Sequence, residues 1–216
     1  MSTIYTVKSV SESPAGISLS VTVEGEKPGT ARLAELLISL EFWTWGKIAV
    51  GEVLSDTVFA DMEHAADFSR GVARTRGILS YSAHSRRALA EKLRGYEFSA
   101  DLSQELADYA VERGYIKENE QACHAADIYL HRKYWGKKRI CAELAARGYG
   151  EEAIAAAIAS IPEGEFQRAL CTLIGRKYGT LPADGGERQK MVLSLLRLGY
   201  TGQEIKDALA SLASSH

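Results

Sequence analysis

The sequence predicts a mainly α-helical protein, in which three tandem three-helix repeats form an elongated, curved array after a small β-containing N-terminal domain. Three observations predict this class. Alternating apolar and polar residues occur in the first third of the 216-residue chain, and apolar residues recur at helical spacing from about residue 56 onward. The helical part also matches itself at a shift of 51 residues. The predicted domains are 1–60, 61–114, 115–161 and 162–216.

The N-terminal domain begins with two segments typical of a β-hairpin. "TIYTVKSV" and "GISLSVTV" alternate apolar and polar residues, are rich in Val, Ile, Tyr and Thr, and are separated by "SESPAG". The next segment, "ARLAELLISL" (31–40), has Leu33, Leu36, Leu37 and Leu40 at helical spacing, so we predict a helix there. The pattern of "EFWTWGKIAVGEVLSD" is compatible with either strand or loop.

From about residue 56 the pattern is helical, and either Ser55 or Asp56 is suited to cap the first helix. Short turns separate the helices, and in several of them a glycine is followed by an aromatic residue, as at helix C-termini.

The repeats rest on apolar positions that coincide at the 51-residue shift. A three-helix unit of this size buries little core by itself, so we expect successive units to stack. The third repeat contains about seven extra residues at 180–186. A single compact helical domain with accidental similarity is the alternative. The matched pairs are Leu89–Ile140, Leu93–Leu144, Phe98–Tyr149, Ile140–Met191, Leu144–Leu195, Tyr149–Tyr200, Ile154–Ile205 and Ile158–Leu209.

Composition and motifs argue against an enzyme. The chain is 46% hydrophobic and 25% charged, as in globular proteins. It has no apolar run of the roughly 18 residues that a membrane span requires and no secretory signal, so we expect a cytoplasmic protein. The three cysteines and five histidines lack metal-ligand spacing, and phosphate-binding or nucleophile motifs are missing. We therefore predict no catalytic residues, no metal and no cofactor.

The charges are unevenly distributed along the chain. Residues 1–69 carry 4 Lys and Arg against 10 Asp and Glu, residues 70–147 carry 15 against 10, and residues 148–216 carry 7 against 8. The basic middle segment favours an anionic partner, either a nucleic acid or an acidic protein surface.

Cations recur at the start of the middle helix of each predicted repeat. Arg86 and Arg87 stand there in the first repeat, Lys137, Lys138 and Arg139 in the second, and Arg188 and Lys190 in the third. Positive charge at a helix N-terminus opposes the macrodipole by up to ~1 kcal/mol, so folding alone does not account for it. A solvated surface face is the alternative interpretation.

Two aromatic residues lie among these cations. Tyr134 and Trp135 could stack on the bases of a single-stranded nucleic acid, which would make the protein a nucleic-acid-binding helical repeat protein. Filling a corner between helices is the alternative for Trp135.

Three segments together resemble the RecX family, the bacterial regulatory proteins of the RecA recombinase. "SRRALAEKL" (85–93), "GYIKENEQA" (114–122) and "GKKRICAELAARGYGEEAIAAAI" (136–158) are similar to family elements in the same order and at similar spacing. The N-terminal strands and "GEVLSD" (51–56) look like the extra β element of some members. Gln121 and Cys123 flank Ala122 where the family usually has an aromatic residue before its alanine.

The resemblance implies a non-enzymatic regulator that binds the RecA–DNA filament and inhibits its recombinase, ATPase and coprotease activities. Such a protein would modulate homologous recombination, DNA repair and the SOS response, and single-stranded DNA within the filament is a further expected contact. A monomer needs no added assumption. The expected partner-binding residues are Arg86, Arg87, Arg132, Lys133, Lys137, Lys138 and Arg139.

Overall fold

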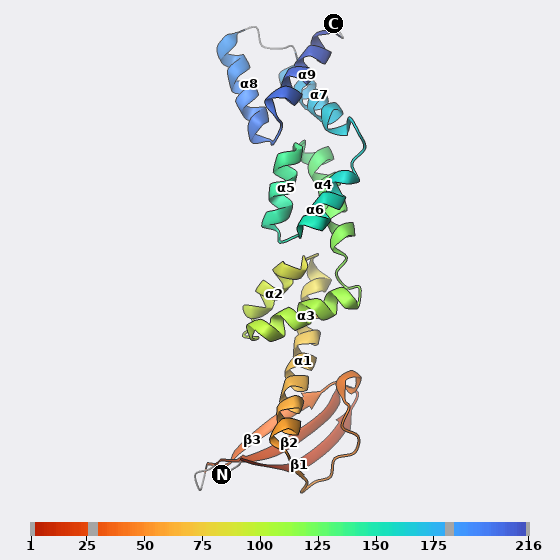
Figure 1. Cartoon of the computed structure of the whole chain (residues 1–216), viewed down its shortest axis with the longest axis vertical. Coiled ribbons are helices and arrows are strands. Elements are labelled where there is room, and N and C mark those ends of the chain that lie inside the picture. The colour runs from red at the N-terminus through yellow and green to blue at the C-terminus, as the bar shows by residue number, and fades with distance from the viewer. Residues whose placement is uncertain (1–2, 26–29, 180–183, 215–216) are drawn as a thin grey trace. The chain divides into compact units, whose positions relative to one another are not determined.

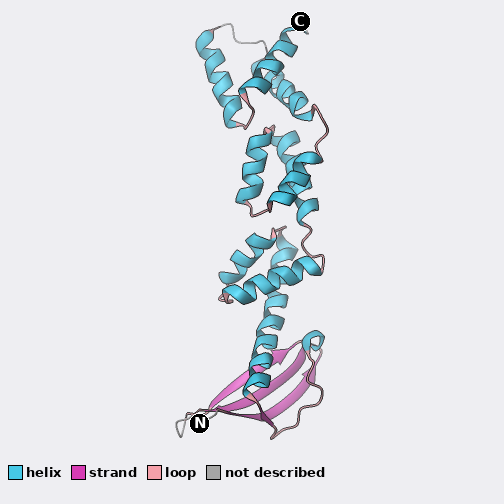
Figure 2. Ribbon diagram, viewed as in Figure 1, coloured by secondary structure: helices cyan, strands magenta, loops and turns pink. Residues whose placement is uncertain are grey.

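The computed structural model describes residues 3–25, 30–179 and 184–214. Over these residues the chain forms a four-stranded antiparallel sheet followed by nine α-helices, so the predicted mainly helical class with an N-terminal β domain is confirmed (Figures 1 and 2). The chain divides into two compact units, which are described separately. The first comprises Met1–Ser82 and Ala90–Tyr109, and the second Ala83–Leu89 and Ala110–His216.

The sheet of the first unit begins with the predicted hairpin. Strand β1 (Ile4–Ser13) pairs with β2 (Gly16–Glu24), so the connecting turn is only Pro14 and Ala15. The strand order is β3-β2-β1-β4, which leaves β3 (Arg32–Ile38) at one edge and the two-residue β4 (Val53–Leu54) at the other. A short 3-10 helix, Leu40–Phe42, follows β3.

The prediction of a helix over 31–40 is wrong, because this segment contains strand β3. Residues Ala34, Leu36 and Ile38 are buried, whereas Leu33 and Leu37 are 58% and 48% exposed. This is the two-residue period of a strand with one face on a core. The high leucine content produced a helical spacing by coincidence, and pairing with β2 in register decides the structure.

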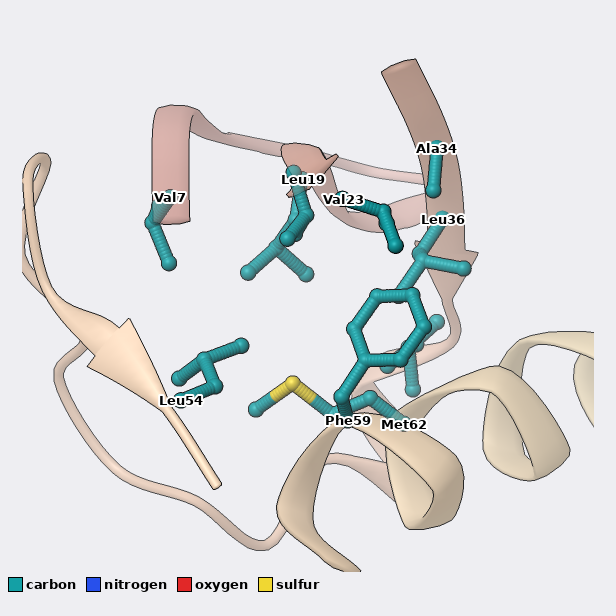
Figure 3. Packing of buried hydrophobic residues seen from close by; sticks show 10 residues of the cluster. Val7, Leu19, Val23, Ala34, Leu36, Leu54, Phe59 and Met62 are labelled. Atoms are coloured by element: carbon teal, nitrogen blue, oxygen red, sulfur yellow. The ribbon is translucent and has the colours of Figure 1, made fainter. Parts of the chain in front are cut away.

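Helix α1 (Asp56–Tyr81) covers one face of the sheet. The Ser55 hydroxyl accepts a hydrogen bond from the backbone N–H of Val58, at 3.3 Å, which confirms Ser55 as the cap. Phe59 and Met62 extend from the first turns of α1 into the core formed by the strands (Figure 3). The helix therefore continues across the predicted domain boundary at residue 60, because its first two turns belong to the core of the sheet.

Two further helices complete this part of the sequence, α2 (Arg86–Arg94) and α3 (Ala100–Glu112). The Tyr109 hydroxyl of α3 donates a hydrogen bond to Glu41 Oε1, at 2.9 Å. The rings of Phe42, Phe68 and Tyr109 meet edge to face, so α1, α3 and the 3-10 helix share one aromatic cluster.

The second unit contains two successive groups of three helices. The first group is α4 (Glu118–Lys133), α5 (Lys137–Ala146) and α6 (Glu151–Ala159). The second is α7 (Glu165–Tyr178), α8 (Gly185–Arg197) and α9 (Gly202–Ser214).

Most of the apolar positions paired at the 51-residue shift lie inside these two groups, and those of the first predicted repeat lie in α2 and in the turn after it. Each group has its own buried cluster. In the first group Ile154 and Ile158 are only partly buried, since the small residues Ala153 and Ala157 face the interior. The fully or nearly fully buried matched residues are Leu89, Leu93, Phe98, Ile140, Leu144, Tyr149, Met191, Leu195, Tyr200, Ile205 and Leu209.

Most of the predicted insertion at 180–186 lies outside the described residues, which resume at Asp184. The Asp184 carboxylate accepts a hydrogen bond from the backbone N–H of Glu187, at 2.9 Å, and so caps α8.

Candidate partner-binding surface

The basic segment 131–139 forms the junction between α4 and α5. Helix α4 ends at Lys133 and is capped by Tyr134, whose backbone is left-handed at φ 53° and whose N–H donates to Leu130 O at 3.0 Å. Next, the Trp135 N–H donates to Tyr129 O at 3.1 Å, and α5 begins after Gly136. This tight reversal places the last turn of α4 and the first turn of α5, and hence their cations, close together.

Trp135 is already surrounded by side chains of its own repeat. Its ring stacks on Tyr129 with centroids 4.8 Å apart. The Lys133 ammonium and the Arg139 guanidinium lie 4.4 and 4.3 Å from its centroid, in the range of cation–π contacts. The residue is half-buried beside the core of α4–α6. These contacts fit the packing role for Trp135, and a nucleic-acid base would have to displace one of them.

Tyr134 has a partner in the following group of helices. Its hydroxyl accepts a hydrogen bond from Arg176 Nη1 of α7, at 2.7 Å, and the Arg176 guanidinium lies 5.7 Å from the ring centroid. Tyr134 thus links α4 to α7 at the end of the basic segment.

Two of the predicted binding cations form hydrogen bonds between the middle helices of successive repeats, which are α2, α5 and α8. Arg87 Nη2 donates to Ala145 O, at 2.8 Å, near the C-terminus of α5. Arg139 Nη1 donates to Arg197 O, at 3.0 Å, at the C-terminus of α8. The C-terminus of a helix carries unpaired carbonyls and partial negative charge, so both guanidinium groups are stabilised there. Their position at a helix start therefore has a structural reason that the spacing in the sequence did not reveal.

Close backbone approach accompanies these bonds. Gly148 has φ 86°, and a Cβ there would lie 2.7 Å from Ser85 Oγ. Gly199 has φ 94°, and a Cβ there would lie 2.5 Å from the backbone N of Arg139. The Ser85 hydroxyl donates to Arg147 O at 2.8 Å, and the Gly136 N–H donates to Leu198 O at 2.8 Å. The turn at Gly148, after α5, thus packs against the start of α2, and the turn at Gly199, after α8, packs against the start of α5.

Arg86 is positioned next to a carboxylate. Its backbone N–H donates to Glu118 Oε1, at 2.8 Å, so the first residue of α4 satisfies an open donor at the start of α2. This anion offsets the positive charge that Arg86 and Arg87 place at the N-terminus of α2.

Arg132, Lys137 and Lys138 remain the best candidates for an anionic partner. All three are exposed, and the structure gives them no hydrogen bond or ion pair with any residue it describes. Lys137 and Lys138 line a hollow of about 490 Å³ together with Cys141, Thr201 and Glu204. The Glu204 carboxylate accepts hydrogen bonds from the Thr201 N–H and hydroxyl, at 2.6 and 2.8 Å, at the N-terminus of α9.

His131 forms a small charged cluster beside these cations. Its Nε2 lies 3.2 Å from Glu165 Oε1 of α7, and its Nδ1 lies 2.9 Å from Asp127 Oδ1. Burial alone would lower the pKa of His131, but hydrogen bonds to Glu165 and to the Asp127 carbonyl outweigh it and raise that pKa. The pKa of Glu165 is lowered by its hydrogen bonds with Arg168 and then His131.

The described residues contain no group of three or more His, Cys, Asp or Glu side chains that could hold a metal ion. Among the same residues, no helix is long and apolar enough to cross a membrane. Cys123, Cys141 and Cys171 are free thiols, and all three side chains are half-buried.

Sequence reasoning missed two features that bear on binding. The docking role of Arg87 and Arg139 depends on carbonyls 58 residues away in the chain, and only the recurrence of Gly148 and Gly199 indicated such a contact. It also missed a groove along β3, because the pattern of this segment predicts a helix. The alternation that marks the strand appears only in the structure, where Leu33 and Leu37 are exposed.

The chain is similar in sequence and in fold to proteins that share one name. No family model matches the chain. The "Regulatory protein RecX" of Herbaspirillum seropedicae is 30% identical over 138 residues, which are 63% of this chain and 86% of that protein. The protein of the same name from Xanthomonas axonopodis pv. citri is 32% identical over 140 residues, which are 63% of this chain and 84% of that protein.

Two solved structures share the fold. The crystal structure of a regulatory protein RecX superposes with a TM-score of 0.70 at 15% identity, covering 94% of this chain and 99% of that one. RecX from Lactobacillus salivarius superposes with a TM-score of 0.61 at 20% identity, covering 68% and 97% of the two chains.

Proposed function

Because this chain belongs to the family of RecX regulatory proteins, we propose that it binds the RecA–DNA filament as a non-enzymatic monomer and inhibits RecA. The activities suppressed are recombination, ATP hydrolysis and coprotease action, so the protein would modulate DNA repair and the SOS response in the cytoplasm.

The observation that carries this proposal is the set of exposed cations without an intramolecular partner. Arg132, Lys137 and Lys138 lie at one helix junction and have no hydrogen bond or ion pair within the described chain. An anionic surface would gain Coulomb energy from them without breaking existing contacts. Arg87 and Arg139, by contrast, bond to helix carbonyls and support the position of the surface.

Stacking on bases has less support than charge contacts. The Trp135 ring has Tyr129, Lys133 and Arg139 as close neighbours, and the Tyr134 hydroxyl is bonded to Arg176. Protein carboxylates or DNA phosphates are therefore the groups that we expect this surface to meet.

The test is RecA-dependent ATP hydrolysis on single-stranded DNA while this protein is titrated into the reaction. We expect inhibition near stoichiometric ratios. The Lys137→Glu, Lys138→Glu double variant should raise the half-inhibitory concentration about tenfold, since the loss of ~1.4 kcal/mol of binding corresponds to that factor. Its melting temperature should stay within about 2 °C of the parent.

A matched control carries the same change in charge away from this surface. Lys8 and Lys47 are exposed residues of the first unit, and the Lys8→Glu, Lys47→Glu variant should inhibit like the parent. Equal weakening by both double variants would mean that net charge acts, not this surface. Absence of inhibition by the parent protein would exclude the proposal.

A further inference from the structure

A large hollow lies in the first unit, far in sequence from the basic segment. It has a volume of about 1100 Å³ and lies between β3 and α1. Strand residues from Arg32 to Leu37 form one wall, and helix residues from Glu63 to Arg76 form the other. We call this hollow the β3 groove.

The strand wall of the β3 groove is an open sheet edge. Within the described residues β3 pairs with β2 on one side, and no strand pairs with its other side. An edge strand presents backbone N–H and C=O groups in the spacing of a sheet ladder, and another extended chain satisfies them best.

The β3 groove has the length of a short strand. The seven residues of β3 span ~23 Å, and α1 covers ~20 Å between residues 63 and 76. Two ion pairs mark its ends: Arg32 of β3 with Glu63 of α1, at 3.6 Å, and Arg76 of α1 with Glu41 of the 3-10 helix after β3, at 3.5 Å. An added strand of five to seven residues, about 17–23 Å long, fits between them.

The exposed side chains of β3 define the partner that fits. Leu33, Glu35 and Leu37 alternate with the buried Ala34 and Leu36, so they share the face turned away from the core. Glu35 forms no ion pair or hydrogen bond with any described residue. Directly opposed residues of neighbouring strands stabilise a sheet when both are apolar or when their charges are opposite.

We propose that the β3 groove binds an extended segment of another polypeptide as a fifth strand, with the side-chain pattern apolar–x–cationic–x–apolar on one face. The two apolar residues lie opposite Leu33 and Leu37, and the Lys or Arg lies opposite Glu35. The acidic balance of residues 1–69, with 10 Asp and Glu against 4 Lys and Arg, also favours a cationic segment.

Strand β3 of a second copy does not have the required pattern. Antiparallel pairing of two β3 strands that places Leu33 opposite the Leu37 of the other copy also places Glu35 opposite Glu35. Like charges directly opposite each other destabilise a strand pair, so the partner strand is not β3 of a second copy.

The experiment uses the full-length protein and fluorescein-labelled peptides of sequence Thr-Val-Thr-Lys-Thr-Val-Thr, with a second probe that has Glu in place of Lys. Anisotropy titrations at low salt measure both affinities. We expect saturable binding of the Lys probe, at least fivefold tighter than binding of the Glu probe. The Glu35→Lys variant should reverse this preference, because the charge opposite the central residue is inverted.

A control and a second variant keep the outcome decisive. Glu12 is an exposed residue of β1 outside the β3 groove, and Glu12→Lys should leave the preference unchanged. Leu33→Thr with Leu37→Thr should weaken both probes about tenfold, with circular dichroism confirming the fold. Failure of the Lys probe to saturate up to about 1 mM, or an unchanged preference in Glu35→Lys, would overturn the proposal. Neither result bears on RecA inhibition, which rests on the second unit.

Discussion

Residues 97, 148 and 199 occupy the same place in three successive turns, 51 residues apart, and all three have positive φ. At 148 and 199 the residue is glycine, and the start of the preceding middle helix lies too close for a side chain. At 97 it is an exposed glutamate with φ 68°. A left-handed non-glycine residue costs roughly 1–2 kcal/mol, which is tolerated at 97, where the side chain has open solvent.

Gly199→Ala should destabilise the protein by about 2–4 kcal/mol, because the left-handed conformation and the approach to the Arg139 backbone both penalise a Cβ. Gly175→Ala is the matched control: it lies in α7 with no atom within 4 Å of the added Cβ. That change should stabilise by about 0.5–1 kcal/mol through helix propensity. Urea unfolding measures both, and equal effects would contradict the docking interpretation.

The sequence identified the cations of the candidate site but could not separate their roles. Lys137, Lys138 and Arg139 are consecutive and have similar charge, yet only Arg139 meets a carbonyl of α8. This difference depends on which side of α5 faces the next repeat, and the local sequence pattern does not predict that orientation. For the same reason the sequence is compatible with both base stacking and core packing for Trp135.

At the level of elements, the helices were predictable and one strand was not. The α-helical repeats contain many apolar positions at a consistent spacing, which fixes their buried faces. Strand β3 is short, and its leucines fall by chance at positions compatible with both periods. Its structure depends on the neighbouring strand β2, so local periodicity alone was insufficient.

Arg139→Met should lower the free energy of unfolding by about 1 kcal/mol, since the variant loses the bond to Arg197 O and the contact with Trp135. Lys138→Met, one position earlier, should change it by less than about 0.5 kcal/mol. Chemical denaturation of the two variants checks this. A larger effect at Lys138 would mean that the assignment of scaffold and surface is reversed.

The contact of α4 with α7 through His131 and Glu165 should depend on pH. The pKa of His131 is raised above 6.5 in the folded chain, so its stabilising effect is complete below about pH 6.5 and is lost as pH rises through the folded pKa. The pKa of Glu165 is lowered below 4.5, so its effect is present above that pH and is lost on acidification. The contact is therefore strongest between about pH 5 and 6.5.

Melting curves of His131→Gln and the parent should consequently differ more at pH 5.5 than at pH 8.5. His124→Gln is the control, because the structure gives His124 no partner among the residues that it describes. A difference independent of pH would show that His131 acts through packing alone.

Considered as a whole, the molecule places its excess positive charge in residues 70–147, between two segments of net negative charge. Binding of an anionic filament should therefore weaken with salt. We expect the half-inhibitory concentration in the RecA assay to rise about tenfold between 50 and 200 mM NaCl, as for two or three neutralised phosphates. For the Lys137→Glu, Lys138→Glu variant the rise should be smaller, and an equal rise would place the charge contacts elsewhere.

The turns at Gly148 and Gly199 also bear on how many repeats such a protein can contain. The group α4–α6 carries both halves of the contact: Gly148 receives the start of α2, while Gly136 and Arg139 receive the turn after α8. A duplication of this segment would meet matching chemistry at each junction and could lengthen the array without a new interface. The first repeat has Glu97 at the glycine position, so a copy inserted before it would find no such fit. We therefore expect insertion of a further repeat to be tolerated better after the first repeat than before it.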